Sequence, residues 1–325
     1  MALWRDKDPE VFIATVSVAA ERIGVPPLAV EKDYWVCEAL RAIVSAHPGE
    51  VVFKGGTSLE KMRIVQRFSE DLDLLVVGEY PSRNSAKNAL KAMIATAAAA
   101  TNGTCRPKAS GGNPGTFHRS AYLDLPLGHS NSFEGLADPK AVLIELGQSG
   151  GPKPSLVRTV ESLLCRALAE TGLIGQWDDL TPFEATILHP GRTLIEKLLR
   201  VNNFVADPTR RDTGDGLPRI GRQFYDIWAL LGEPTVVDLL TDKVLFGDIL
   251  TSVFEVSKTL NPECPVPGGG FAASAAFDPS GAFAAELRQQ HQRAMRGLYY
   301  GQAPPSFDDV LDRIQSSSEL LNPES

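Results

Sequence analysis

Two short segments constrain the fold of this chain most strongly: a strand-like run that ends at two glycines, and an acidic run close behind it. The first run, Val51-Val52-Phe53-Lys54, breaks at Gly55-Gly56-Thr57-Ser58. The second run is Arg67-Phe68-Ser69-Glu70-Asp71-Leu72-Asp73-Leu74-Leu75-Val76-Val77. The order of strand, glycine turn, short helix and acidic strand is far more specific than either run alone, and it predicts a fold that mixes helices with a sheet.

The acidic run predicts a metal site. Residues two apart on a strand face the same side, so Ser69, Asp71 and Asp73 are expected to share one face. Neighbouring carboxylates repel, and each raises the pKa of the other unless a cation neutralises them. Oxygen ligands of this kind suit Mg²⁺, which binds through one or two carboxylates plus substrate phosphates. Asp-x-Asp is also frequent in solvated loops and calcium sites, but charges within an apolar strand are costly without a purpose.

The glycine turn predicts a phosphate site. Glycines let backbone N–H groups approach a ligand closely, a helix N-terminus favours phosphate, and two hydroxyls add donors. An ordinary strand-to-helix connection with Thr57 or Ser58 as N-cap is the alternative. Together the two segments describe a site for a nucleoside triphosphate and its metal. The candidate nucleotide-binding residues are Lys54, Gly55, Gly56, Thr57, Ser58 and Arg67.

These blocks and several other segments resemble the nucleotidyltransferase superfamily that includes DNA polymerase β and, more narrowly, the AbiEii/AbiGii toxin family with its MenT members. The other segments are Glu31-Lys32-Asp33-Tyr34-Trp35, Ile144-Glu145, Ile195-Glu196-Lys197-Leu198 and Tyr225-Asp226-Ile227. The resemblance implies an α/β (α+β) fold, a polymerase-β-like mixed sheet with flanking helices plus a mostly helical C-terminal domain. It also implies a Mg²⁺-dependent toxin that transfers a nucleoside monophosphate from an NTP to the 3′ end of tRNA, with an antitoxin encoded separately.

The patterning predicts a mixed-sheet domain with N-terminal helices over residues 1–155 and a mostly helical domain over 156–325. The resemblance implies that the first is the nucleotidyltransferase domain and that the second completes the active site. Expected helices cover 9–23, 28–46, 59–65 and 82–100, and expected strands cover 51–54, 67–77, 120–125 and 141–147. Residues 101–117 and 207–217 are expected as loops, and a capped helix is expected to start at 181–184.

Glu145 is the candidate third carboxylate. It is the only charge in Ala141-Val142-Leu143-Ile144-Glu145-Leu146-Gly147, a segment predicted to be a strand buried on both faces. A solvated strand end is the alternative explanation. The resemblance implies that a third carboxylate beside the acidic pair binds metal and helps to deprotonate the attacking hydroxyl. Asp124, at the end of the preceding strand, is the second choice.

Lys197 and Asp226 form a second candidate cluster, to which the resemblance assigns catalytic roles together with Ser69. Lys197 lies at the edge of an apolar helical stripe, where a snorkelling lysine is the usual explanation. A lysine aimed at the triphosphate would instead neutralise charge on the leaving pyrophosphate. Asp226 has a simpler alternative, an i, i+4 pair with Arg222.

Basic residues gather between positions 187 and 222, where seven face four acidic ones. Solvated loop charge is one explanation, and an RNA-facing patch is the other, because phosphate neutralisation supplies most sequence-independent affinity. The candidate RNA contacts are Arg63, Arg200, Arg210, Arg211, Arg219 and Arg222.

The net charge of −8 argues against a protein that coats nucleic acid indiscriminately. No uncharged apolar run is long enough to span a membrane, the N-terminus lacks the regions of a signal peptide, and the four cysteines form no CxxC pair, so a cytoplasmic protein is expected. Two other functions stay open: adenylylation of a protein or small molecule, and an inactive relative that only binds nucleotide.

Overall fold

A computed structural model describes residues 2–108, 118–147, 151–210, 216–258 and 262–324. The chain divides into two compact units, which we describe separately. Unit 1 comprises Met1–Arg63, Phe68–Gln148 and Ser155–Ile187, and unit 2 comprises Ile64–Arg67, Ser149–Pro154 and Leu188–Ser325.

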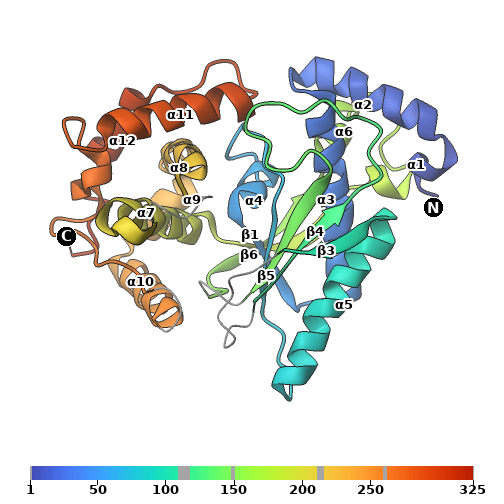
Figure 1. Ribbon diagram of the computed structural model, residues 1–325. Coiled ribbons are helices and arrows are strands. Elements are labelled where there is room, and N and C mark those ends of the chain that lie inside the picture. The colour runs from blue at the N-terminus through green and yellow to red at the C-terminus, as the bar shows by residue number, and fades with distance from the viewer. Residues whose placement is uncertain (1, 109–117, 148–150, 211–215, 259–261, 325) are drawn as a thin grey trace. The chain divides into compact units, whose positions relative to one another are not determined.

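Unit 1 contains a sheet and the helices that flank it (Figure 1). Its helices are α1 (Trp4–Lys7), α2 (Pro9–Ile23), α3 (Pro27–Ala46), α4 (Gly55–Lys61), α5 (Arg83–Thr101) and α6 (Leu163–Ala167). Its strands are β1 (Val51–Lys54), β2 (Leu72–Val76), β3 (Thr104–Pro107), β4 (His118–Asp124), β5 (Ala141–Gly147), β6 (Ser155–Val160) and β7 (Phe183–Leu188).

Among the described residues the strands form one mixed sheet of seven, in the order β3-β4-β5-β2-β1-β7-β6. β1 and β2 are antiparallel, as are β3 with β4 and β4 with β5. β2 and β5 are parallel, and β1 pairs with β7 in the parallel sense through Phe53 and Ile187. The mixed sheet with flanking helices confirms the predicted fold class.

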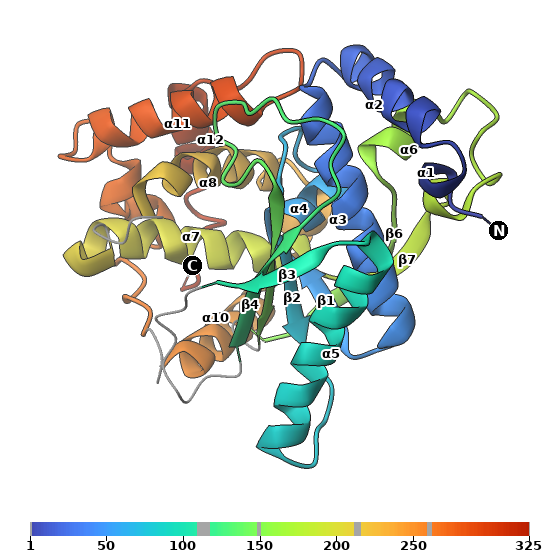
Figure 2. The same cartoon turned by 45° about the vertical axis from the view of Figure 1, so that its right-hand side comes forward.

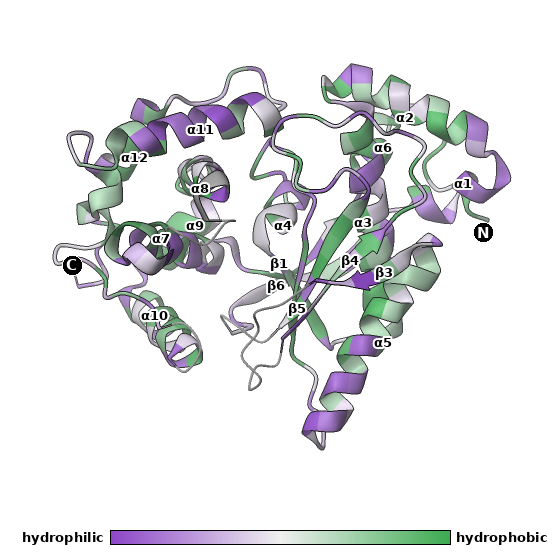
Figure 3. Ribbon diagram, in the orientation of Figure 1, coloured by the Kyte–Doolittle hydropathy of each residue, from purple (hydrophilic) through white to green (hydrophobic). Residues whose placement is uncertain are grey.

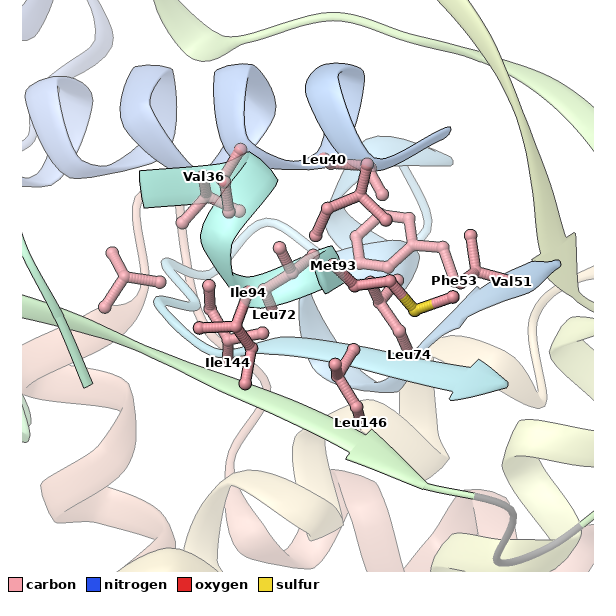
Figure 4. Packing of buried hydrophobic residues seen from close by; sticks show 14 of the residues in the cluster. Val36, Leu40, Val51, Phe53, Leu72, Leu74, Met93, Ile94, Ile144 and Leu146 are labelled. Carbon is pink, nitrogen blue, oxygen red and sulfur yellow. The ribbon is translucent and has the colours of Figure 1, made fainter. Parts of the chain in front are cut away.

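One face of this sheet is apolar and is covered by α3 and α5 (Figure 2). Leu40 of α3 and Met93 of α5 belong to the same buried cluster as Leu72, Leu74 and Ile144 of the sheet (Figure 4). The first turns of α5 are hydrophilic and its later turns carry the apolar stripe (Figure 3). The alternate residues of the central strands therefore point away from α3 and α5.

Two predicted boundaries at the key segments are wrong. The helix after β1 begins at Gly55 and ends at Lys61, with Lys54 as its N-cap, so neither Thr57 nor Ser58 caps it. Gly55 has a φ of +81°, and this glycine lets the chain turn from strand to helix without a loop. The acidic strand begins only at Leu72, so Ser69 and Asp71 lie in the segment that leads into β2.

Three predictions further along the chain are also wrong. The residues expected to start a capped helix at 181–184 instead enter β7, and the expected helical pattern from 156 contains β6. Within the expected loop over 101–117, residues 104–107 form β3, and 109–117 lie outside the described residues. β7 has buried Ala185 and Ile187 at alternate positions, but its partner β1 lies far earlier in the chain, so no local signal marked the pairing.

Unit 2 is helical in the residues that the structure describes. Its main helices are α7 (Pro190–Ala206), α8 (Gly216–Leu230), α9 (Pro234–Thr241), α10 (Lys243–Ser257), α11 (Ala284–Leu298) and α12 (Phe307–Ser316). Phe224 of α8 packs at ring-centroid distances of 5.8 Å from Phe277 and 5.1 Å from Phe307. Pro190 is the first residue of α7, a position where its missing N–H costs nothing.

The two units do not follow a single cut in the chain. Residues 155–187 belong to unit 1, because β6 and β7 complete its sheet, and residues 64–67 belong to unit 2. Two domains that meet near residue 155 stay a prediction. No single helix of the described chain is long and apolar enough to cross a membrane; α2 and α3 pass that test only together, and they are bent by 112° at their break.

Candidate active site

A row of four residues crosses the sheet of unit 1. Lys54 of β1 lies opposite Asp73 of β2, and Asp73 lies opposite Glu145 of β5. Ser120 of β4 extends the row on the other side of Glu145. Cross-strand partners share one face, and this is the face away from α3 and α5. All four residues are half-buried, so the sheet presents two adjacent carboxylates and one ammonium that keep access to solvent.

The backbone of Gly55 lies directly against the carboxylate of Asp73. A Cβ placed on Gly55 would stand 2.3 Å from Asp73 Oδ2, closer than side-chain atoms can approach. The positive φ of this residue is a second reason why glycine is required. The sequence predicted that the glycine turn and the acidic strand lie close together, and in the structure Gly55 and Asp73 are in contact.

The two hydroxyls after the glycines are engaged within the protein. Thr57 Oγ1 donates to the Asp71 carbonyl oxygen at 2.5 Å and lies 3.0 Å from Ser69 Oγ. Ser58 Oγ donates to the Gly55 carbonyl oxygen at 2.9 Å. Both side chains are buried. Thr57 thus contacts both Ser69 and Asp71, which lie in the segment that precedes β2.

Glu145 and Asp124 occupy opposite ends of the same sheet face. Glu145 Oε1 lies 3.4 Å from Lys108 Nζ and 3.3 Å from Ser120 Oγ. Asp124 pairs with Arg106, whose Nε lies 2.9 Å from Asp124 Oδ1. Because Glu145 is the direct neighbour of Asp73 and Asp124 lies four positions further along the neighbouring strand's face, the register favours Glu145 over Asp124 as the third carboxylate.

The donor chemistry of this row fits a magnesium ion. Asp73 and Glu145 supply carboxylate oxygens side by side, and Asp71 precedes Asp73 by two residues. In the described part of the chain, no group of three or more His, Cys, Asp or Glu side chains is arranged as a complete metal-ligand set. Mg²⁺ needs no such set, because it is held by one or two carboxylates together with substrate phosphates and water.

Unit 2 brings together Arg67, Lys197 and Asp226. Arg67 pairs with Asp226 through two bonds of 2.6 Å, from Nε to Oδ1 and from Nη2 to Oδ2. Lys197 Nζ lies 2.7 Å from Asp226 Oδ2 and donates to Gln223 Oε1 at 2.9 Å. Lys197 is 8 % exposed, so it is not a snorkelling surface lysine. Asp226 therefore accepts from two cations, and neither of them is Arg222.

The pKa values in this cluster follow from burial and charge. Burial alone would raise the pKa of Asp226, but Arg67 and Lys197 together lower it to about 2. Burial lowers the pKa of Lys197 below the usual lysine value, and the neighbouring positive charges of Arg67 and Arg222 add to that effect against Asp226. The cluster holds a firmly ionised carboxylate and an ammonium whose charge is costly to keep.

The candidate RNA-contacting arginines are dispersed. In unit 1, Arg63 is exposed and pairs with Glu161. In unit 2, Arg210 is flanked by Asp207 at 3.3 Å and Glu263 at 3.8 Å, which offset its charge. Arg200 is exposed on α7, and Arg219 and Arg222 are half-buried on α8. Arg211 lies outside the described residues.

The sequence analysis did not single out Lys108, Ser120 or Gln223. Lys108 and Ser120 reach Glu145 only through the pairing of β4 with β5, which has no local signal. Gln223 did have a local sequence signal, because it lies three residues before Asp226 and therefore on the same side of a helix.

The mixed sheet thus places two candidate carboxylates side by side, with the backbone of Gly55 against one of them. The model of the nucleotidyl transferase AbiEii toxin family of type IV toxin–antitoxin systems matches residues 38–313. The chain therefore belongs to the AbiEii family of nucleotidyltransferase toxins, which confirms the resemblance stated above. A toxin of this kind has a separate antitoxin as its partner.

Other comparisons add little. No curated protein matches the chain. A crystal structure of a candidate nucleotidyltransferase from H. pylori aligns at 15 % identity and a TM-score of 0.35, covering 88 % of this chain and 94 % of that one. The crystal structure of JHP933 from Helicobacter pylori aligns at 13 % identity and a TM-score of 0.34, covering 87 % and 93 %. Such low scores carry no argument about function.

Proposed function

We propose that this chain transfers a nucleoside monophosphate from an NTP to an acceptor hydroxyl, with release of pyrophosphate and with Mg²⁺ as cofactor. The observation that carries the proposal is the register of Asp73 with Glu145, beside a glycine whose backbone touches the Asp73 carboxylate. Carboxylates placed in this way serve to hold a metal and to receive a proton, which are the two needs of phosphoryl transfer.

In this proposal Asp71 and Asp73 hold the metal, and Glu145 completes its protein ligands. The bound ion would lower the pKa of the acceptor hydroxyl and neutralise phosphate charge. Glu145 Oε1 accepts the proton of that hydroxyl, and Ser120 Oγ, 3.3 Å away, keeps the carboxylate oriented. Lys108 Nζ lies 3.4 Å from the same oxygen and is a second partner that positions it.

The phosphate contacts come from the turn after β1. Lys54 lies opposite Asp73 in the row, and the backbone of Gly55, which Gly56 follows, lies directly against that carboxylate. The hydroxyls of Thr57 and Ser58 are already occupied within the protein, so these residues shape the cradle through their backbone. Ser69 acts through its contact with Thr57.

Lys197 supplies positive charge for the leaving pyrophosphate. Its ammonium has three contacts at most, and Asp226 and Gln223 use two of them. Arg67 holds Asp226 in place from its other side through a bidentate pair. A lysine held in this way is oriented before substrate arrives, which is how charge stabilisation becomes effective in a transition state.

The acceptor proposed here is the 3′ end of tRNA. The family of toxins supports a target whose loss arrests growth, and unit 2 offers exposed Arg200 on the same helix as Lys197. Neutralisation of phosphates by such side chains gives RNA affinity without sequence preference.

One incubation series tests this function. Purified protein is mixed with each labelled NTP and Mg²⁺, and with total tRNA, total protein or an aminoglycoside as acceptor. We expect label to enter tRNA from one preferred NTP, with pyrophosphate released in equal amount. Label on protein or on the small molecule instead would overturn the RNA assignment. No NTP consumption with any acceptor would overturn the transferase assignment of this chain.

A further inference from the structure

Two rows of side chains face each other inside unit 1, and each row ends in a charge. Val36 and Leu40 of α3 belong to the same apolar cluster as Leu72 and Leu74 of β2 (Figure 4). One helical turn before Val36 comes Lys32, and two residues before Leu72 comes Glu70. The apolar contact between helix and strand is thus continued by an ion pair where the acidic run begins.

This ion pair is closed into a ring with the loop between β4 and β5. Lys32 Nζ donates to Glu70 Oε2 and, at 2.5 Å, to the Asp138 carbonyl oxygen. The other oxygen of Glu70 accepts from the Ala137 backbone N–H at 2.6 Å. The side chains of Lys32 and Glu70 are 0 % and 7 % exposed. The acidic run, α3 and the end of the loop therefore meet at one buried point.

Stability does not account for this arrangement. Replacement of a buried ion pair by apolar residues of similar volume is often neutral or stabilising, because two charges must be taken out of water. Burial raises the pKa of Glu70 even though the ammonium of Lys32 opposes the rise. A leucine or methionine at both positions would continue the apolar rows at no such cost.

The place of this ion pair in the chain indicates that it positions the segment before β2. Glu70 stands between Ser69 and Asp71 in a segment outside any strand, where no ladder fixes the backbone. Adjacent residues in an extended run point to opposite sides. Thr57 holds Ser69 and Asp71 from the side of α4, and Lys32 holds Glu70 from the side of α3. The two anchors together hold the backbone that carries the Asp71 carboxylate.

The residues on either side of Lys32 act in a similar way. Glu31 accepts from the backbone N–H groups of Gly128 and His129, at 2.7 and 2.9 Å, near the start of the same loop. Asp33 pairs with Lys61 at the end of α4 and accepts from the Leu163 N–H at 2.6 Å. Three consecutive charged residues of one buried helix thus bind four segments: the loop between β4 and β5, the acidic run, α4 and the start of α6.

We propose that Lys32 is a positioning residue of the transfer site: through Glu70 it sets the direction of Ser69 and Asp71, and through the Asp138 carbonyl it fixes the adjoining loop to the same point. The inference rests on the proposed function for the role of Asp71. It assigns Lys32 and Glu70 no contact with substrate.

The test compares charge removal at two buried glutamates of unit 1. Glu38 is a matched control, because its side chain is 6 % exposed, it pairs with Arg5 at 3.2 Å, and it lies on α3 away from the acidic run. Glu70→Gln and Glu38→Gln each remove one buried charge without a change in size. A double variant, Lys32→Met with Glu70→Gln, removes both charges and still lets residue 70 accept from Ala137.

Two quantities are measured on folded protein, kcat for pyrophosphate release and the NTP affinity by calorimetry with Mg²⁺ or with EDTA. We expect Glu70→Gln and the double variant to lose about 10- to 100-fold in kcat and in the gain of affinity that Mg²⁺ confers, the scale for residues that orient metal ligands. NTP affinity in EDTA should stay within about 2-fold, and Glu38→Gln should keep both quantities.

Two outcomes would overturn the inference. The first is a double variant with wild-type kcat and wild-type metal dependence, because the pair would then be structural only. The second is an equal loss in Glu38→Gln, because any buried charge would then have the same effect. A wild-type protein whose NTP binding ignores Mg²⁺ is a different result: it contradicts the proposed function, and this inference with it.

Discussion

The two charged clusters of this molecule differ in exposure and in how their charges are matched. The sheet row of unit 1 is half-buried, and its carboxylates Asp73 and Glu145 stand side by side. The cluster of unit 2 is buried, and its single carboxylate, Asp226, is held by two cations. The first arrangement keeps two neighbouring carboxylates within reach of solvent, and such oxygen ligands suit a metal ion. The second is satisfied from within and suits the fixed placement of one ammonium.

The largest effect is expected from removal of charge in the sheet row. Asp73→Asn should lower transfer by about 10³-fold, because the metal loses a carboxylate while size is kept. Circular dichroism should show unchanged folding, since the side chain is half-buried. Asp124→Asn is the control, on the same sheet face but paired with Arg106. Near-wild-type transfer by Asp73→Asn at saturating Mg²⁺ would show that the row is not the metal site.

Loss of the ammonium in the buried cluster should come next. Lys197→Met should lower transfer by about 10²-fold and relieve growth arrest on expression. The Arg67–Asp226 pair stays intact, so the free energy of unfolding should change by no more than about 1 kcal/mol. Arg67→Met, which breaks that pair, should instead destabilise the protein by about 3–5 kcal/mol. Chemical unfolding and growth assays measure both; equal toxicity of Lys197→Met would remove its catalytic role.

Acid should weaken the buried cluster in a defined range. The pKa of Asp226 is lowered to about 2, against about 3.9 in an unfolded chain. Its stabilising effect is therefore fully present above about pH 4 and is lost as pH falls toward 2, a change of about 2–3 kcal/mol. The advantage of wild type over Asp226→Asn in urea unfolding should shrink over that range. An advantage that is constant with pH would contradict the ion pairing.

A smaller effect is expected from a methyl group between glycine turn and carboxylate. Gly55→Ala and Gly49→Ala share the same backbone strain, with φ of +81° and +75° and a cost of about 1–2 kcal/mol each. Only at Gly55 would the new Cβ meet Asp73; at Gly49 nothing lies within 4 Å. Transfer should fall about 10-fold in Gly55→Ala alone. Equal activity of the two variants would separate the turn from the site.

The smallest effect concerns the RNA. Arg200→Gln should weaken tRNA binding by about 3-fold and reduce the salt slope by about 1. Arg210→Gln should change neither, because Asp207 and Glu263 already offset its charge. Filter binding at several salt concentrations measures both. Identical slopes for wild type and Arg200→Gln would show that this arginine does not touch phosphate.

The sequence predicted most of what is local. Helix 9–23 and strand 141–147 have the expected bounds, and the Gly-Gly and Asp-x-Asp segments are adjacent as expected. Contacts between distant segments escaped it. β7 could not be recognised from its own residues. Its alternate residues Ala185 and Ile187 are buried because the strand pairs with β1, which lies far earlier in the chain.

The same limit applied to the candidate site. Arg67 was predicted to bind nucleotide and Asp226 to be catalytic, with a pair to Arg222 as the alternative for Asp226. The structure pairs Arg67 and Asp226 with each other. Nothing in either local segment encodes that contact. The sequence does contain a signal for Lys32 and Glu70, because each is a charged residue next to the apolar residues of its helix or strand. A charge that breaks such a pattern is a candidate positioning residue even where no motif marks it.

The strand order has a consequence for the time course of synthesis. The strands that make the acidic row, β1, β2, β4 and β5, have all been translated once Gly147 is added to the chain. β7 follows some way behind, and Lys197 and Asp226 come later still. Because folding begins with the earlier part of a nascent chain, the carboxylates are assembled before the ammonium exists. A prematurely terminated product would carry one half of the proposed catalyst, and a cell would be spared its toxicity until translation is nearly complete.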